Sequence, residues 1–312
     1  MKVRIWLALI AVYIVWGSTY LAIRFAVTTI PPFLMAGMRF LIPGAILYAW
    51  RRLAGDAAPT RIQWRSAAII GFFLLLGGNG GVTWAEQRVA SSITALIVGS
   101  APVWMVLIDA LRRGGQRPTW LVATGVLIGL LGIVLLVGPS EWGGGQLQMD
   151  TPGVAVLLLA ALFWAIGSLY GRTAQLPDSP LMGTGMEMLA GSAGLFLAGT
   201  LTGEWRQLNL NAVAPSSLWG LAYLVVFGSL VGFVCYTWLL RVAPTPLVAT
   251  YAYVNPLIAI IMGNLLAKEA ITPLLLIAAL VIVGAVVLIN TGRAKAAEPA
   301  SRMVVAPAPG ED

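Results

Sequence analysis

The sequence predicts an all-α integral membrane protein, with ten transmembrane helices arranged as two five-helix repeats of inverted topology. Three observations support this fold class. Of the 312 residues, 59% are hydrophobic and only 10% are charged, whereas soluble domains carry about 25% charged residues. Ten apolar windows are each long enough to cross a bilayer core, which takes roughly 20 helical residues. The two halves of the chain also repeat each other's short motifs.

The ten windows cover most of the chain between short polar connections. They lie at 5–23, 31–50, 67–85, 91–111, 119–138, 153–171, 179–199, 217–240, 246–266 and 272–292. Lys2 and Arg4 precede the first window, and no small-residue cleavage site follows it, so it resembles a signal anchor. The third and eighth windows are rich in glycine, and the loss of either one would invert half of the predicted topology.

The basic residues predict the orientation of the chain. With ten spans, both termini lie on one side, which then receives fourteen of the nineteen Lys and Arg residues. Arg24, Arg88, Arg206 and Lys268 fall on the other side, and Arg39 lies within a span. Because cytoplasmic loops carry an excess of Lys and Arg, we expect a multi-pass protein of the bacterial inner (plasma) membrane with both termini cytoplasmic. The net charge of +7 then reflects orientation, and nucleic acid is not an expected partner.

The repeat is visible in motifs that recur at offsets of 148 to 154 residues. The motif P-x-x-x-x-G-M occurs at Pro32 and again at Pro180, and Gly17-Ser18 recurs as Gly167-Ser168. Because each unit has an odd number of spans, the second copy enters the membrane from the opposite side, an arrangement typical of secondary transporters. The predicted organisation is a first repeat at 3–138, an external linker at 139–151, a second repeat at 152–291 and a disordered cytoplasmic tail at 292–312.

Two charged residues occupy the same position in the second and seventh spans, Arg39 and Glu187. A charge within the bilayer is expected to face the bundle interior and to have a partner. One interpretation is that the two residues pair. In the other, each acts in its own half: Arg39 caps free carbonyls or touches solute, and Glu187 is the titratable group for proton coupling or a counter-ion for an amine.

Aromatic and polar residues at mid-span depth predict a cavity that binds solute at the interface of the repeats. The candidates are Trp16, Tyr20, Arg39, Asn79, Ser100, Trp104, Trp164, Ser168, Tyr236, Tyr253 and Asn255. Core packing is the alternative for each of them. An aromatic lining favours apolar, aromatic or cationic solutes. Pro102 and Pro256 fall mid-span in both halves, where a proline kinks a helix, and we expect them to act as hinges rather than as packing features alone.

Composition excludes several mechanisms. The chain has no histidine and one cysteine, Cys235, so we expect no intrachain disulfide, no metal site and no cofactor. The P-loop pattern G-x-x-x-x-G-K-[ST] does not occur, so the sequence contains no P-loop nucleotide site.

The order and spacing of these motifs over residues 3 to 291 resemble the drug/metabolite transporter superfamily, specifically the YedA-like or YddG-like branch of the EamA-type exporters. The resemblance rests on the two five-span halves, Arg39, Met186-Glu187-Met188 and the pattern G-x-L-x-x-x-E at Gly263 and Glu269. It implies export of small metabolites, amino acids or xenobiotics through a central cavity lined by spans one, three, four, six, eight and nine.

The chain departs from the family pattern in the loop after the fourth span. A glutamate is absent there, and the loop reads DALRRGGQRPTW, with Asp109 and three arginines. A proton-coupling role for the loop glutamate is therefore not expected, and we interpret Glu269 as a structural or interfacial carboxylate.

The sequence thus favours a secondary active transporter that exports small metabolites or cationic drugs by alternating access. The metabolites implied are amino acids, aromatic or similar to threonine and homoserine. The alternatives are a solute-binding sensor or scaffold on a transporter fold and a membrane-embedded enzyme. The enzyme is disfavoured because no histidine and no cluster of acids is present. The expected partners are a small-molecule substrate and the lipid bilayer, and the chain is a monomer or a homodimer.

Overall fold

The computed structural model describes residues 2–112, 118–137, 150–243, 245–248 and 250–304. These residues form helices and short connections, and no β-strand occurs among them. Nine of the described helical runs are long and apolar enough to cross a membrane, and a shorter apolar helix, Tyr251–Ala267, accompanies them. The prediction of ten transmembrane helices is confirmed, including the two glycine-rich windows.

The helices follow one another with short connections. In chain order they are α1 (Lys2–Ala26), α2 (Pro32–Leu53), α3 (Arg61–Ile70), η1 (Gly71–Gly80), α4 (Gly81–Ala85), α5 (Ser91–Gly99), α6 (Ala101–Leu111), α7 (Trp120–Val137), α8 (Thr151–Gly171), α9 (Pro180–Leu201), α10 (Glu204–Gln207), η3 (Leu210–Ala212), α11 (Pro215–Tyr223), η4 (Leu224–Val231), α12 (Gly232–Val242), α13 (Thr245–Val248), α14 (Tyr251–Ala267) and α15 (Pro273–Val304). We call the end of the bundle where α1 begins the terminal face, and the other end the opposite face.

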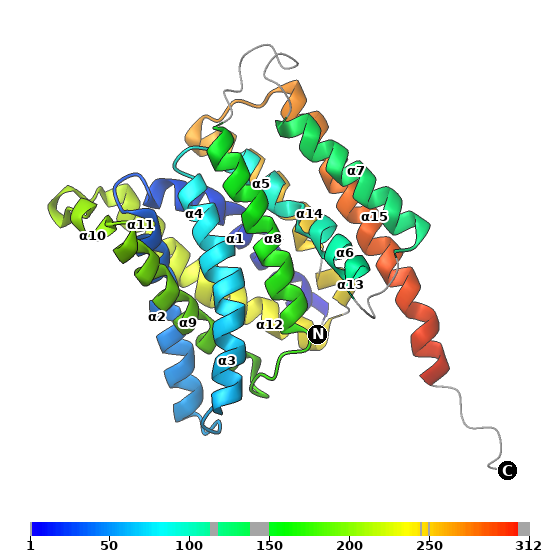
Figure 1. Ribbon diagram of the computed structural model, residues 1–312, viewed down its shortest axis with the longest axis horizontal. Coiled ribbons are helices and arrows are strands. Elements are labelled where there is room, and N and C mark those ends of the chain that lie inside the picture. Colours follow the sequence, from blue (N-terminus) through cyan, green and yellow to red (C-terminus); the bar gives the residue numbers. More distant parts are fainter. Residues whose placement is uncertain (1, 113–117, 138–149, 244, 249, 305–312) are drawn as a thin grey trace.

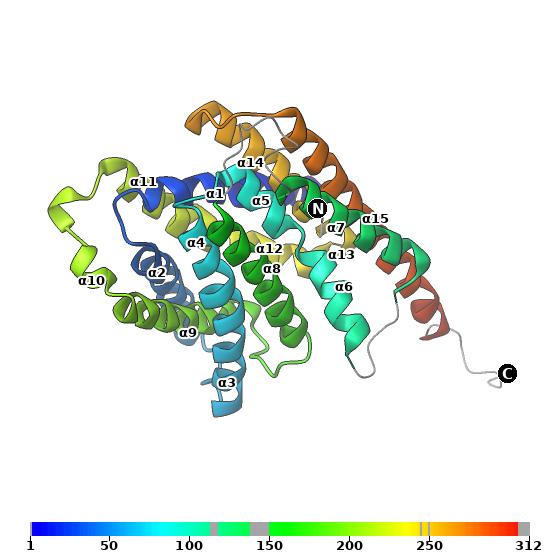
Figure 2. The same ribbon diagram turned by 45° about the horizontal axis from the view of Figure 1, so that its top comes forward.

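The repeats interlock around the middle of the bundle. Helices α2 and α9 pack side by side at one edge and α7 and α15 at the other, with the remaining spans between them (Figures 1 and 2). In the middle, α1 of the first repeat packs against α11, η4, α12 and α14 of the second. Its counterpart α8 packs against α3, η1, α4, α5 and α6 of the first repeat. Each repeat therefore supplies one central helix that is held mainly by the other repeat.

Glycines allow the pair α2–α9 to approach closely. A Cβ added at Gly185 would lie 2.9 Å from the backbone nitrogen of Tyr48, and one added at Gly44 would lie 2.9 Å from Cβ of Met188. Lipid tails are as apolar as the side chains, so the hydrophobic effect does not drive helices together within a bilayer. Helices there associate through close packing, which small residues such as glycine allow. The glycine of the repeated P-x-x-x-x-G-M motif thus has a packing role in α9.

The glycine-rich spans contain π-helical turns, η1 in the third span and η4 in the eighth. The two segments overlap when Trp84 is aligned with Trp238, the residues that end these spans in the two repeats. π-helical turns are rare in proteins as a whole, but those that do occur inside longer helices are often located at functional sites. The equivalent location of the two π-helices in the repeats therefore points to the third and eighth spans as candidate parts of a functional site.

The fourth span differs from the predicted mid-helix kink. The α-helix ends at Gly99, a turn follows at Ser100, and a new helix begins at Ala101. Pro102 therefore lies in the first turn of α6, where its missing N–H costs nothing because that group has no partner within the helix. Pro256 does lie inside a helix, α14, as predicted.

The C-terminal boundary also requires a correction. The predicted disordered tail was 292–312, but α15 continues to Val304, because this segment is rich in strong helix formers such as Ala, Lys and Arg. Residues 305–312 lie outside the described residues. The same holds for most of the predicted linker, of which the structure describes Asp150, whose side chain caps α8, and Thr151.

Candidate functional site: a cavity between the repeats

A cavity of about 320 Å³ lies between the two repeats. Its walls come from α1, α2, η1, α4, α5 and α6 of the first repeat and from α8, η4, α12, α13, α14 and α15 of the second. Ligand pockets in proteins typically measure about 300–1,000 Å³, so this cavity suits a small solute.

Seven of the predicted cavity residues line it, together with both predicted hinge prolines. They are Trp16, Tyr20, Arg39, Asn79, Trp164, Tyr236, Asn255, Pro102 and Pro256. Five predicted site residues do not, namely Ser100, Trp104, Ser168, Tyr253 and Glu187.

Two of the residues outside the cavity have clear structural roles. Ser100 is fully buried, and its hydroxyl donates to the carbonyl of Ile97 at 2.5 Å. The hydroxyl of Tyr253 accepts a hydrogen bond from the amide of Asn290 at 3.0 Å. Because Asn290 itself lines the cavity, Tyr253 supports the wall from behind.

Trp16 and Trp164 belong to the two central helices, α1 and α8. In α1, the indole Nε1 of Trp16 donates to the carbonyl of Gly228 in η4 at 3.1 Å. In α8, the ring of Trp164 lies against Gly78 in η1, where an added Cβ would be 3.1 Å from the ring. Each tryptophan therefore contacts a glycine in the π-helix of the other repeat. A side chain would take up the space of the indole at Gly78 and at Gly232, the first residue of α12, where an added Cβ would collide with Nε1 of Trp16.

An aromatic cluster forms part of the wall around Trp16. The centroid of its ring lies 5.4 Å from that of Phe233, 5.0 Å from that of Tyr236 and 5.1 Å from that of Tyr251. Such tilted and edge-to-face pairs stabilise a packed arrangement by about 0.5–1.5 kcal/mol each beyond their buried area. The wall is consequently apolar and well ordered.

The π-helix η1 also explains Asn79. Its side-chain amide donates to the carbonyl of Leu74, five residues earlier, at 3.1 Å. Asn79 thus lines the cavity while it satisfies the backbone of its own helix.

Arg39 projects into the cavity from α2 and is only 5% exposed. Its Nε and Nη1 atoms are buried, and neither has a hydrogen-bond partner among the described residues. The Cζ atom lies 4.8 Å from the ring centroid of Phe40. A guanidinium at mid-membrane costs about 2.5–3.5 kcal/mol on insertion scales, and here hydrogen bonds do not offset that cost.

The structure shows no ion pair between Arg39 and Glu187 among the residues that it describes. Glu187 is partly exposed and does not line the cavity. Helices α2 and α9 run antiparallel, with Gly44 beside Met188. Arg39 and Glu187 are therefore displaced along the helix axes, by several residues at ~1.5 Å each.

The cavity extends to the terminal face. Its lining includes Arg172, an exposed residue directly after α8, and Arg293 near the end of the membrane-spanning part of α15. Both are located where α8 and α15 reach the terminal face. Solute in the cavity would therefore meet two cations between the middle of the membrane and this face.

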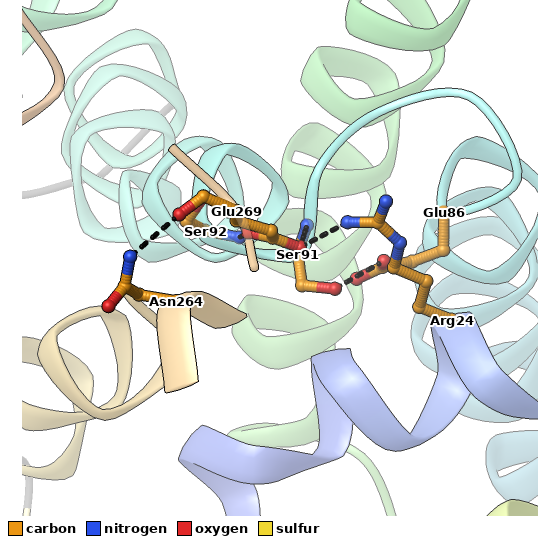
Figure 3. Close-up of polar contacts among 6 residues, drawn as sticks. All are labelled: Arg24, Glu86, Ser91, Ser92, Asn264 and Glu269. Carbon is orange, nitrogen blue, oxygen red and sulfur yellow. Dashed lines mark hydrogen bonds and ion pairs between the residues drawn. The ribbon is translucent and has the colours of Figure 1, made fainter. Parts of the chain in front are cut away.

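At the opposite face lies a polar network that we call the seal, formed by Arg24, Glu86, Ser91, Ser92 and Glu269 (Figure 3); none of these residues belongs to the described lining of the cavity. The carboxylate of Glu269 accepts hydrogen bonds from the backbone amides of Ser91 and Ser92, at 2.9 and 3.0 Å. It also forms an ion pair with Arg24. The seal joins α1, the start of α5 and the loop between α14 and α15. It therefore ties the first repeat to the second.

Gly263 explains why the motif G-x-L-x-x-x-E needs its glycine. A Cβ at Gly263 would lie 2.6 Å from Oε2 of Glu269. The chain folds back through Lys268, which has a left-handed conformation with φ of 52°, so that the amide of Glu269 donates to the carbonyl of Gly263 at 3.1 Å. The motif thus places a carboxylate against the end of its own helix and against the start of α5.

The two carboxyl groups of the seal have opposite electrostatic surroundings. Burial raises the pKa of Glu86 well above its usual range, and the nearby Glu269 raises it further, although a hydrogen bond from Ser91 opposes the shift. Burial also acts to raise the pKa of Glu269, but hydrogen bonds from Ser92 and Ser91 and the charge of Arg24 outweigh it, so the pKa of Glu269 is lowered. The seal therefore favours a neutral Glu86 beside an ionised Glu269.

Several residues of the site were not predicted as site residues from the sequence. Phe40 and Phe233 line the cavity, but nothing separates them in the sequence from other buried phenylalanines. Arg172 and Arg293 also line it, whereas the sequence suggested only a role in orientation. The repeat could have indicated Arg172, because this residue follows Arg24 by 148 positions, an offset within the range of the other repeated motifs.

A helical membrane bundle of two interlocked five-span repeats, with a solute-sized cavity between them, defines a membrane transporter. The family comparison agrees, since the model of the EamA-like transporter family matches residues 3–138 and 151–291. The chain therefore belongs to the EamA-like transporter family, within the drug/metabolite transporters.

Two of the relatives below are named as transporters, and the third is named as a WAT1-related protein. The chain is 38% identical over 288 residues to the "Uncharacterized inner membrane transporter YedA" of Escherichia coli, covering 92% of this chain and 90% of that protein. It is 26% identical to "Uncharacterized transporter YvbV" of Bacillus subtilis, covering 93% and 92%, and 26% identical to the chloroplastic "WAT1-related protein At3g02690" of Arabidopsis thaliana, covering 91% and 69%. The protein is accordingly a multi-pass inner membrane transporter.

A solved crystal structure shares the fold. It superposes with a TM-score of 0.62 at 20% identity and covers 93% of this chain and 98% of its own.

Proposed function

We propose that the protein is a secondary active transporter that exports small solutes by alternating access. The observation that carries this proposal is the asymmetry of the cavity. Its lining reaches exposed Arg172 at the terminal face, whereas at the opposite face the seal around Glu269 ties the two repeats together and contributes no residue to the described lining. A site open to one side at a time is what alternating access requires.

The distribution of basic residues supports a cytoplasmic terminal face. Most Lys and Arg residues belong to the ends and loops on that face, in agreement with the positive-inside rule. With this orientation, we interpret the structure as an inward-open state in which solute enters from the cytoplasm. Because the sequence has no P-loop motif, an ion or solute gradient supplies the energy.

Opening to the other side requires the seal to break and a new contact to form at the terminal face. Arg172 and Arg293 lie at that face. Asp109 ends the fourth span near the terminal face, as Glu269 follows the ninth span at the opposite face. We assign Arg172, Arg293 and Asp109 to the contact that closes the terminal face in the outward-open state.

The flexible points are the turn at Ser100 and the proline in α14. A Cβ at Gly99 would lie 3.1 Å from Cγ of Pro256, so the break in the fourth span and the proline of the ninth span are in contact. Movement at one is therefore transmitted to the other by packing.

Counterflow in proteoliposomes tests the proposal. Liposomes are loaded with unlabelled candidate solutes, and uptake of the same labelled solute is measured with and without a proton gradient. Transient accumulation above equilibrium is expected for a carrier. Saturable binding without counterflow would instead indicate a solute-binding sensor or scaffold, and flux that does not saturate would indicate a channel.

A further inference from the structure

We infer that Arg39 forms an anion-binding subsite and that the solute is a small organic acid, with one carboxylate on an apolar or aromatic body. This inference deepens the proposed function, and it rests on that function in taking the cavity as the place where solute binds.

The first observation is the unsatisfied guanidinium. Arg39 is 5% exposed, and its buried Nε and Nη1 atoms have no acceptor among the described residues. Buried donors of a charged group are normally paired, because desolvation without a partner is costly. A carboxylate in the cavity would supply both the acceptor atoms and the opposite charge.

The second observation is the sign of the charge around the cavity. The charged residues that line it are Arg39, Arg172 and Arg293, and no Asp or Glu belongs to the described lining. Glu187, the acid predicted as a counter-ion for an amine, lies outside the lining. Charges interact strongly in a site of low dielectric constant, so a cationic solute is repelled and an anionic one attracted. This argues against the cationic drugs that the aromatic lining alone would admit.

The third observation concerns the rest of the site. Next to Arg39 lies the ring of Phe40, at 4.8 Å from Cζ to the ring centroid, and aromatic rings around Trp16 form another part of the wall. Asn255 offers an unpartnered Oδ1, but an amide can turn its NH₂ group to the same place, so it does not select the charge of the solute. The volume of about 320 Å³ restricts the solute to a small molecule.

The arginines also define an order of contact. Arg172 is exposed at the terminal face, whereas Arg39 is buried deep in the cavity. Cations at a mouth raise the local concentration of anions and speed their entry. The acid would first meet Arg172 and Arg293 and then reach Arg39, where an ion pair is no longer screened by water.

Three probes of similar shape and different charge test the inference. Binding of phenylacetate, phenylacetamide and 2-phenylethylamine to the full-length protein in nanodiscs of uncharged lipid is measured by calorimetry at neutral pH. We expect phenylacetate to bind ~10-fold or more tightly than either of the other two, as one charge-assisted hydrogen bond suffices for such a ratio. The inference is overturned if the amine binds as tightly as the acid, or if the acid does not bind at any soluble concentration.

Variants assign the preference to Arg39. Arg39→Gln should remove the preference for the acid over the amide, Arg39→Lys should retain part of it, and the exposed Arg206→Gln at the opposite face is the control that should change nothing. An unchanged preference in Arg39→Gln would refute the subsite. If that variant does not fold, the comparison between Arg39→Lys and the wild type decides, since an unchanged ratio there also counts against a guanidinium site.

The proposed function and the subsite fail separately. Selective binding of the acid without counterflow would refute transport but leave the subsite intact. Counterflow of neutral or cationic solutes that is unaffected by Arg39→Gln would refute the subsite but leave transport intact.

Discussion

Glu269 accepts two hydrogen bonds from a single residue, Ser92, one from its backbone amide at 3.0 Å and one from its hydroxyl at 2.7 Å. Helix α5 begins at Ser91, and the preceding Ala90 has no side chain that could cap it. The loop between α14 and α15 therefore provides the cap that α5 lacks, with a carboxylate at the positive end of the helix. Opening of the seal would leave this helix end without its cap.

Glu269→Gln should weaken the seal. The substitution keeps the shape but removes the charge, and hydrogen bonds to charged groups contribute about 1.5–3 kcal/mol. We expect a cysteine at Val98, which lines the cavity, to react at least ~10-fold faster with a membrane-impermeant thiol reagent applied at the opposite face. The reaction is followed in a Cys235→Ala background.

Glu204→Gln is the matched control for this experiment. Glu204 caps α2 in the same manner, accepting from the amides of Phe33 and Leu34 at 3.2 and 2.9 Å, but it does not belong to the seal. Equal labelling in both variants would show that Glu269 does not control access. Gly263→Ala should reproduce the effect of Glu269→Gln, because the new Cβ would occupy the place of the carboxylate.

The seal should depend on pH through Glu86. Its pKa is raised, so its contribution is fully present at a pH below the usual value for glutamate and is lost as the pH rises through the raised pKa. The pKa of Glu269 is lowered, so its contribution is lost only as the pH falls through that lowered value. Labelling of the Val98→Cys protein at the opposite face should therefore increase with rising pH.

Glu86→Gln should abolish this increase, because the amide remains neutral at every pH. Arg24 and Glu269 are the charged groups that act on Glu86, and both remain in the variant. Glu187→Gln is the comparison, since the sequence predicted Glu187 as the coupling residue. If Glu187→Gln removes the pH dependence and Glu86→Gln does not, the titrating group lies on α9 and the prediction for Glu86 is wrong.

The contact between η1 and α9 should be sensitive to a single methyl group. A Cβ at Gly71 would lie 2.7 Å from the carbonyl oxygen of Glu187 and 2.8 Å from the nitrogen of Gly191, both backbone atoms that cannot move independently. Overpacking of this kind typically costs about 1–3 kcal/mol, so Gly71→Ala should lower the melting temperature in detergent. Gly284→Ala, where nothing lies within 4 Å of the new Cβ, should leave the melting temperature unchanged or raise it.

Pro256→Ala should slow transport if the proline is a hinge. Alanine restores an N–H that can donate to the carbonyl of Ala252, which straightens and stiffens α14. We expect the counterflow rate to fall by about 10-fold, equivalent to ~1.4 kcal/mol in the barrier. Pro43 lies inside α2 and is buried, and Pro43→Ala is the control for the general effect of replacing a helical proline; an equal loss in both variants would contradict the hinge.

The spans were predictable from the sequence because a bilayer imposes a minimum length of apolar helix. Once the ends of each span are known, the depth of a residue follows from its position in the span. This is why Trp16, Trp164 and Tyr236 could be predicted to lie at the depth of the cavity; their roles remain predictions. The relation between Arg39 and Glu187 could not be predicted in this way. It depends on the antiparallel register of α2 and α9 and on how far each helix is rotated, which the contact between Gly44 and Met188 determines.

The seal was equally inaccessible to sequence reasoning. Arg24 and Glu269 are separated by 245 positions, and their contact depends on how the two repeats dock. Ser100 illustrates a local limit. The sequence drew attention to Pro102, but the helix breaks two residues earlier, because a proline fits the first turn of the helix that follows.

The matched π-helices η1 and η4 carry information about the history of the chain. A π turn holds more residues than an α turn, so each of these spans contains surplus chain relative to a regular helix. Two separate insertions at equivalent depth would require a coincidence, whereas one insertion in an ancestral five-span protein requires none. The surplus is thus older than the duplication, and the ancestral half already contained a π-helical segment in this span.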